Sequence, residues 1–307
     1  KGVSAAVNIP NQGLWQGVSG LSGQAPPDTI APDTRFALAS ITKTFTAVLV
    51  LKLSEEDRLA LQDPLHRWLP KFPNIDPNIT VLQLLNHTSG VFNFTNNPTL
   101  WNTNWALPNR IWKPTEIIDA FVGPPVFQPG SGLEYSNTNY LLLQMIVEAV
   151  TDSSVSALFR NRFFNPLGLK STFLPAEELV TGKVAHNWSD TNKDGELEDL
   201  STRTGLAMYS MSRAGGGLVS TAEDAAKWAD ALYGGRILNS ESLTQMLNFE
   251  PVSSNSYWTG YGLGAMQMNL GGEEIWGHTG LLPGYRSFLA YVPSIGASIC
   301  VLVNQED

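Results

Sequence analysis

The segment from Phe36 to Leu53 constrains this chain more than any other, because it is almost continuously apolar yet carries two reactive side chains. Its apolar residues recur at three- and four-residue steps, which is the spacing of one helical face: Ile41, Phe45, Val48, Leu49 and Leu53. Further apolar residues fill the opposite side. The sequence therefore predicts a helix over residues 36–53 that is buried nearly all round, with Ser40 and Lys43 in its first turn.

Ser40 and Lys43 have a spacing that makes side chains neighbours on a helix. A serine hydroxyl becomes a good nucleophile only when a base takes its proton, and a lysine can be that base when burial lowers its pKa. The unpaired N–H groups and the positive dipole end of a helix N-terminus would also stabilise an oxyanion at Ser40. The alternative is a serine that caps the helix, followed by an ordinary helical lysine.

Composition limits the number of packed units and the kinds of partner. A chain of 307 residues exceeds the ~250 residues at which one core tends to divide, so two packed units are expected. The net charge of −9 argues against nucleic acid and anionic membranes as partners, and it says nothing about a small neutral or cationic substrate. No apolar run approaches the ~18 residues of a membrane span. The single cysteine, Cys300, excludes a disulfide framework, and no cofactor is predicted.

Short apolar runs at both ends of the chain predict β-strands. They lie at Val3–Ile9, Leu14–Ser19, Glu274–Thr279, Ser287–Tyr291 and Ala297–Val303. Helical patterns fill most of the chain between them, while residues 185–208 read as a polar loop. We therefore predict an α+β fold with a five-stranded antiparallel sheet flanked by helices. Residues 1–60 and 212–307 would form the sheet unit, residues 61–211 a helical insertion, and the active site their interface.

A second motif, Tyr135-Ser136-Asn137, precedes a strongly amphipathic stretch that predicts a helix over Asn137–Val150. A tyrosine with a lowered pKa can relay a proton to a leaving group. An asparagine amide can bond a substrate carbonyl or hold a lysine in place. Taken alone, the motif also fits a turn and a helix cap.

A third motif, His278-Thr279-Gly280, ends a predicted strand. Glycine permits close backbone approach, and the N–H of Leu281 could donate to an oxyanion. Taken alone, His278 also fits a histidine at a strand edge that bonds to backbone.

In this order and spacing, the three motifs resemble those of the serine β-lactamase and penicillin-binding protein superfamily. The Tyr-x-Asn motif and His278 resemble in particular a group that contains class C β-lactamases, D-alanyl-D-alanine carboxypeptidases, D-amino-acid amidases and family VIII esterases. Four further segments resemble this group and extend the resemblance over nearly the whole chain: residues 84–90, 166–169, 214–221 and 277–284.

The resemblance implies a β-lactamase/transpeptidase-like fold and a serine hydrolase that forms an acyl-enzyme without a cofactor. Ser40 would attack the substrate carbonyl, and Lys43 and Tyr135 would handle protons as a coupled pair. The implied substrate-binding residues are Asn137, His278, Thr279 and Gly280. The backbone N–H groups of Ser40 and Leu281 would form the oxyanion hole.

The implied reaction is cleavage of a D-alanyl peptide, amide or ester, as in a D-alanyl-D-alanine carboxypeptidase or a β-lactamase. Class C β-lactamases usually carry Lys-Thr-Gly where this chain has His278-Thr279-Gly280, which ranks efficient β-lactam hydrolysis lower. Two alternatives remain: a family VIII-type carboxylesterase with weak β-lactamase activity, and a non-catalytic penicillin-binding protein. A Ser-His-Asp hydrolase that uses His278 is disfavoured because no Gly-x-Ser-x-Gly motif occurs.

Specificity depends on residues outside the three motifs. A carboxypeptidase should hold the terminal carboxylate of its substrate with a cation, and Arg213 and Arg286 are the candidates. The aromatic and Asn-rich segment 93–114 either packs an irregular subdomain or forms a wall of the binding cleft.

The acidic segment around Asp190 resembles the first half of a calcium-binding loop. Asp190, Asn192 and Asp194 would supply ligands, followed by Gly195 and Glu196, but Ser201 stands where such a loop needs a glutamate. The alternative is an acidic surface turn without metal.

The chain opens on Lys1 without an initiating methionine, so a leader could have been removed. With only 15% charged residues, the composition suits an extracellular or periplasmic protein. The family also has a helix before its first strand and a long helix after its last. Neither is evident between Lys1 and Asp307, so we expect such helices to lie outside this sequence or the sheet to be covered otherwise. The oligomeric state is left open.

Overall fold

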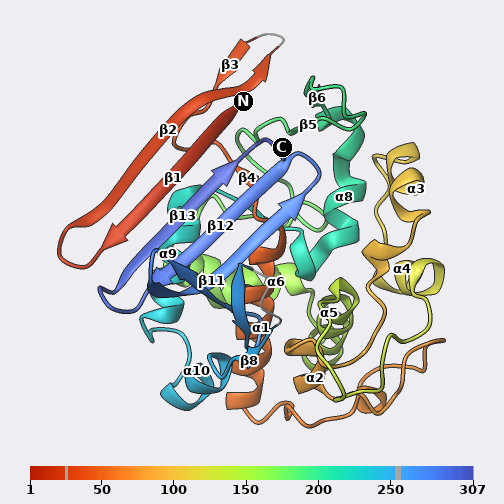
Figure 1. Ribbon diagram of the computed structural model, residues 1–307. Coiled ribbons are helices and arrows are strands. Elements are labelled where there is room, and N and C mark those ends of the chain that lie inside the picture. The colour runs from red at the N-terminus through yellow and green to blue at the C-terminus, as the bar shows by residue number, and fades with distance from the viewer. Residues whose placement is uncertain (25–26, 253–256, 307) are drawn as a thin grey trace.

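The computed structural model describes residues 1–24, 27–252 and 257–306. Its largest element is a nine-stranded antiparallel sheet with the order β3-β2-β1-β13-β12-β11-β10-β9-β8 (Figure 1). The strands of this sheet are β1 (Gly2–Ile9), β2 (Gly13–Gln24), β3 (Pro27–Thr29), β8 (Glu250–Pro251), β9 (Trp258–Tyr261), β10 (Met266–Leu270), β11 (Glu273–Leu282), β12 (Tyr285–Val292) and β13 (Ala297–Val303). Together with the helices, the sheet confirms the predicted α+β class.

The predicted count of five strands is wrong. The five predicted strands are β1, β2, β11, β12 and β13, and the sheet continues beyond them at both edges. Glycines interrupt the segment that forms β9 and β10, at positions 260, 262 and 264, and the register shifts between Gln267 and Met268. No continuous alternating apolar pattern therefore indicates these strands. Strands β3 and β8 contain only three and two residues, which is too short for any periodicity.

The first and last described strands are neighbours in the middle of the sheet. Ala6 of β1 pairs with Cys300 of β13, and both residues are fully buried. Figure 1 shows β1 in red beside β13 in blue, so the two ends of the chain lie side by side. Helix α9 (Ala222–Tyr233) packs on β1, β12 and β13. Thr221 caps this helix by accepting a hydrogen bond from the N–H of Asp224.

Most helices come from the chain between the two groups of sheet strands. The helices are α1 (Thr42–Glu55), α2 (Val81–Leu85), α3 (Leu100–Ala106), α4 (Pro114–Phe121), α5 (Asn137–Thr151), α6 (Val155–Phe159), α7 (Asn165–Leu167), α8 (Ser201–Gly216), α9 and α10 (Ser240–Met246). Shorter helical turns are η1 (Ala39–Ile41), η2 (Leu65–Arg67), η3 (Phe94–Asn96) and the π-type η4 (Arg160–Phe164). Two small sheets pair β4 (Phe36–Ala37) with β7 (Val219–Ser220) and β5 (Trp188–Ser189) with β6 (Glu198–Asp199). The division into a sheet unit and a helical insertion stays a prediction.

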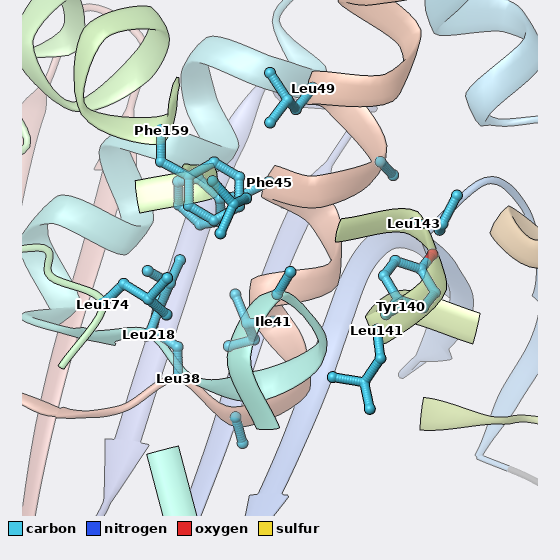
Figure 2. Packing of buried hydrophobic residues seen from close by; sticks show 14 of the residues in the cluster. Leu38, Ile41, Phe45, Leu49, Tyr140, Leu141, Leu143, Phe159, Leu174 and Leu218 are labelled. Atoms are coloured by element: carbon cyan, nitrogen blue, oxygen red, sulfur yellow. The ribbon is translucent and has the colours of Figure 1, made fainter. Parts of the chain in front are cut away.

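The central helix begins later than its apolar pattern indicates. Residues 36–37 form β4, and Ala39 has a φ of 47°, a left-handed conformation that an α-helix does not contain. A short turn, η1, therefore carries Ser40, and α1 starts at Thr42. The predicted burial of α1 is correct. Phe45 stacks on Trp228 of α9 at 3.8 Å between ring centroids, and Figure 2 shows Phe45 also packed against Phe159 of α6.

The segment predicted as a polar loop, residues 185–208, contains the start of α8. This helix is kinked at Gly205 and Arg213, which have φ values of 22° and 34°. A Cβ at Gly205 would lie 2.3 Å from the carbonyl oxygen of Pro108, so glycine is required where the two segments cross. Helix α8 was not predicted because its apolar pattern is weak and because it contains glycines, which disfavour helices.

Within the described residues, no single helix is long and apolar enough to cross a membrane. One pair, α5 with the segment Val155–Leu167, passes by length and composition, but it is bent by 78°.

Candidate active site

Three separate parts of the chain meet around one large cavity of about 800 Å³. The turn η1 contributes Ser40, the segment before α5 contributes Tyr135, and strand β11 contributes Thr279. The cavity is also lined by other residues that the motifs predicted: Asn137, His278 and Leu281. The structure thus brings the three sequence motifs to one site.

Lys43 lies beneath Ser40 and is fully buried. Its Nζ lies 3.1 Å from Ser40 Oγ, 2.7 Å from Asn137 Oδ1 and 2.5 Å from the carbonyl oxygen of Gly215. Two of these partners, the amide oxygen and the carbonyl, can only accept hydrogen bonds. A neutral amine has two N–H groups for these acceptors, and its lone pair is then left for the Ser40 hydroxyl proton. The geometry therefore suits Lys43 as the base for Ser40.

Burial favours the same protonation state. Desolvation lowers the pKa of Lys43 well below its usual value, because a charged ammonium loses its hydration inside the protein. The described residues give Lys43 no carboxylate partner that would oppose this effect. Sequence reasoning anticipated the effect from the apolar character of the helix.

Asn137 begins α5 and is held by a second asparagine. Its backbone N–H donates to Asn93 Oδ1 at 3.1 Å, and its side-chain Nδ2 donates to the same oxygen at 3.3 Å. This fixes the amide so that Oδ1 points to Lys43. Of the two predicted roles for Asn137, the structure thus supports holding the lysine in place. No sequence motif indicated this role for Asn93, which lies in the segment 93–114.

The pKa of Tyr135 shifts in the direction opposite to our prediction. We expected a lowered pKa, but burial raises the pKa of Tyr135, and the neighbouring Ser40 hydroxyl offsets only part of the rise. The prediction failed because a sequence does not show how completely a side chain is enclosed. The Tyr135 hydroxyl has no hydrogen-bond partner of good geometry among the described residues. It therefore stays protonated and can donate to a bound molecule.

His278 is fully buried, and both of its ring nitrogens are engaged. Nδ1 donates to the Thr279 carbonyl at 2.5 Å, so Nε2 accepts from the Tyr261 hydroxyl at 3.1 Å. Desolvation lowers the pKa of His278 from 6.5 to about 3. The ring has no free nitrogen for a substrate or for Ser40. This geometry gives no support to direct substrate binding by the His278 ring and disfavours a Ser-His-Asp mechanism.

Thr279 and Gly280 lie in β11, which packs against the turn that carries Ser40. The Thr279 hydroxyl lies 2.7 Å from the hydroxyl of Tyr257, a contact that no sequence motif predicted. A Cβ at Gly280 would lie 2.4 Å from the Leu38 carbonyl oxygen and 2.8 Å from the Ala39 side chain. Glycine is therefore required for close approach here, as predicted. Leu281 lines the cavity, and the oxyanion-hole roles of its N–H and that of Ser40 stay predictions.

The aromatic segment 93–114 serves both of its predicted roles. Trp101 and Trp105 line the cavity, whereas Trp112 is buried and donates through Nε1 to Asn104. The segment is thus partly a cleft wall and partly core.

The two arginines expected to hold a carboxylate lie elsewhere. Arg213 is buried, where it pairs with Glu177 at 2.7 Å and donates to the Trp112 carbonyl. Arg286 is exposed and donates through Nε to the carbonyl oxygen of Glu306. Neither arginine is among the described residues that line the cavity.

In the acidic loop at Asp190, the side-chain oxygens accept hydrogen bonds from backbone N–H groups of the same loop. Asp190 accepts from the N–H groups of Asp194 and Gly195, and Asn192 also accepts from Asp194. Glu196 donates its N–H to Asp194. The described residues contain no group of three or more His, Cys, Asp or Glu side chains placed for a metal ion. This geometry gives no support to a calcium site at these residues.

The comparison with known proteins agrees with this site. The profile of the family described as Beta-lactamase matches residues 1–307. The chain belongs to the β-lactamase family. This membership agrees with the geometry of the site, where the Ser40 hydroxyl lies beside the buried amine of Lys43.

Related proteins in this family bind or cleave different molecules. Penicillin-binding protein 4* of Bacillus subtilis is 29% identical over 89% of this chain, which spans 61% of that protein. A D-stereospecific amidohydrolase from Streptomyces has a TM-score of 0.88 at 30% identity, covering 99% of this chain and 89% of its own. A D-amino acid amidase from Ochrobactrum anthropi, solved with D-phenylalanine, has a TM-score of 0.87 at 30% identity and coverages of 99% and 86%.

Proposed function

We propose that the protein is a serine amidohydrolase that cleaves D-amino acid amides and short D-peptides with uncharged leaving groups. The observation that carries this proposal is the hydrogen bond of 3.1 Å between the Lys43 amine and the Ser40 hydroxyl, in a cavity where the described lining residues include no lysine or arginine for a carboxylate. The two solved structures at 30% identity, which are D-specific amide hydrolases by name, support the substrate class.

In the proposed acylation, Lys43 Nζ takes the proton of Ser40 as Oγ bonds to the substrate carbonyl carbon. The electron pair of the C=O bond moves onto oxygen, which the N–H groups of Ser40 and Leu281 would stabilise. When the C=O bond re-forms, the bond to the leaving amine breaks. Tyr135 donates its proton to that amine and recovers one from the Lys43 ammonium. Water then attacks the acyl-enzyme and releases Ser40.

The lining of the cavity favours an uncharged leaving group over a carboxylate. Among the described residues, the lining contains no lysine or arginine, and its one carboxylate is that of Glu306. A D-alanyl-D-alanine carboxypeptidase must desolvate a terminal carboxylate, which is costly without a cation. Carboxypeptidase and β-lactamase activities are therefore ranked second, since both kinds of substrate carry a carboxylate. A carboxylesterase remains a specific alternative, because an ester also has an uncharged leaving group.

The experiment is a substrate panel for the purified chain. D-phenylalanine amide, L-phenylalanine amide, a D-Ala-D-Ala peptide, a p-nitrophenyl ester and nitrocefin would be compared, with Ser40→Ala as the control. We expect the D-amide to be cleaved with a higher kcat/KM than the L-amide and the D-Ala-D-Ala peptide. Turnover of the ester alone would favour the esterase. Labelling of Ser40 by a fluorophosphonate without turnover of any substrate would favour the non-catalytic penicillin-binding protein.

We also propose that the protein works outside the cytoplasm. The proposal rests on composition alone, and cell fractionation of the source organism with an antibody to the protein tests it. Recovery in the cytosolic fraction would overturn it.

A further inference from the structure

His87 is a buried histidine that the mechanism above does not use. It is fully buried and lies in the segment 84–90, one of those that carry the family resemblance. Its φ of 61° is left-handed, which costs free energy for any residue other than glycine. A strained and buried histidine next to the active site calls for a physical explanation.

The backbone on both sides of Tyr135 is attached to His87. The N–H of Glu134 donates to the His87 carbonyl at 3.1 Å, and the N–H of Ser136 donates to His87 Nδ1 at 3.2 Å. The backbone of His87 is left-handed in this arrangement, where the carbonyl and the ring of His87 both bond to the segment that precedes α5. Tyr135 is thus held between two hydrogen bonds to a single residue.

The His87 ring also packs on the Tyr135 side chain. Their ring centroids are 4.4 Å apart with a tilt of 40°. The Tyr135 hydroxyl has no hydrogen-bond partner of good geometry among the described residues, so its position depends on packing and on the backbone. His87 contributes to both.

The tautomer of His87 is fixed by its neighbours. Nδ1 accepts from Ser136 and also lies 3.2 Å from Asn139 Nδ2, so a neutral ring carries its proton on Nε2. Ser89 donates to Asn139 Oδ1 at 2.7 Å, which turns the amide nitrogen of Asn139 toward the ring. Burial lowers the pKa of His87, so the ring stays neutral and Nδ1 stays an acceptor.

We propose that His87 is a positioning residue that fixes Tyr135 for proton donation to the leaving group. This inference rests on the proposed function, because it assumes that Tyr135 donates that proton. A leaving amine or alkoxide needs the proton, whereas p-nitrophenolate leaves without one. His87 should therefore matter for the first kind of substrate and little for the second.

The test compares His87→Asn with His87→Leu. In asparagine, Oδ1 is attached to Cγ, as Nδ1 is in histidine, and it can accept the same hydrogen bond. Leucine has a similar size but no acceptor. For D-phenylalanine amide we expect His87→Leu to lower kcat/KM by about 100-fold and His87→Asn by less than about fivefold. For a p-nitrophenyl ester, both variants should stay within about threefold of the wild type. Equal losses on the two substrates would mark a merely structural role and overturn the proposal.

A second comparison asks whether His87 acts through Tyr135. In a Tyr135→Phe background, His87→Leu should cost less than about threefold more on the amide. A full additional 100-fold loss would overturn the proposal. If His87→Leu does not fold, as circular dichroism would show, His87→Phe keeps the ring but lacks the acceptor and takes its place. If the wild type cleaves esters but no amide, the proposed amidase function fails by itself, and the comparison proceeds with methyl against p-nitrophenyl esters.

Discussion

At Lys43, burial and hydrogen bonding both favour the neutral form of the amine. Desolvation lowers the pKa of the amine, and the two carbonyl-type acceptors at Asn137 and Gly215 occupy its N–H groups. Neither effect alone would direct the lone pair to Ser40. The proposed acylation thus depends on a neutral lysine rather than on a charged one.

We therefore expect Lys43→Arg to abolish activity although it keeps a long basic side chain. A guanidinium stays protonated at any working pH, so it cannot take the Ser40 proton. Hydrolysis of a p-nitrophenyl ester should fall by about 1,000-fold, measured by absorbance. Lys52→Arg, in the same helix and paired with Glu55 at the surface, is the matched control and should be unchanged. Retained activity in Lys43→Arg would show that another group is the base.

The buried histidines predict how stability depends on pH. His278 is neutral in the folded state, with its pKa lowered from 6.5 to about 3, whereas the unfolded chain binds a proton below about pH 6.5. The unfolded state therefore holds more protons between these values, and the free energy of unfolding rises with pH there by about 1.4 kcal/mol per pH unit for this residue. This contribution is complete above pH 6.5 and is lost as the pH falls toward 3.

Urea titrations of the wild type and of His278→Gln at several pH values between 4 and 7 measure this effect. The variant should show a slope smaller by about 1.4 kcal/mol per pH unit. Identical slopes would mean that the histidine is charged in the folded protein, against the hydrogen bonds that engage both of its ring nitrogens.

At the scale of elements, apolar periodicity predicted which helix is buried. It did not predict features that depend on tertiary contacts, such as the residue at which that helix begins. The apolar pattern of α1 indicated its burial, but the start at Thr42 depends on β4 pairing with β7 far along the chain. The motifs indicated the residues that meet at the cleft. They did not indicate Asn93, Tyr257 or the carbonyl of Gly215, because such contacts have no local signature.

Gly280 tests the contact between β11 and the turn that carries Ser40. In Gly280→Ala, the new methyl group would meet the Leu38 carbonyl oxygen at 2.4 Å and the side chain of Ala39 at 2.8 Å. Strand and turn must then separate, so we expect activity to fall by at least about tenfold and the protein to lose about 1–3 kcal/mol of stability. Gly123→Ala, whose Cβ would meet only ordinary contacts at 3.5 Å, is the control. Enzyme assays and thermal unfolding distinguish the two.

At the scale of the whole molecule, the sheet joins both ends of the described chain. β1 lies between β2 and β13, so the first described strand pairs directly with the last. Five strands could be predicted because they show alternation, while the order β1-β13-β12 could not, since pairing between distant strands is set by the fold and not by either sequence alone. Neither the strand patterns nor the family resemblance led us to predict this order.

Because β1 pairs with β13, we expect the reactivity of Cys300 to report on global unfolding. The thiol is the single cysteine of the chain, it is fully buried in β13 opposite Ala6, and burial raises its pKa, which suppresses the reactive thiolate. In native buffer, a disulfide reagent such as DTNB should label it at least about 1,000-fold more slowly than a free thiol. Across a urea titration, labelling should appear with the same midpoint as the loss of circular dichroism, because β1 and β12 cover β13 on both sides. Cys300→Ser should give no signal. If labelling instead precedes the loss of structure and of activity, then β1 separates from β13 before the rest of the sheet, and the two ends of the chain do not unfold as one cooperative unit.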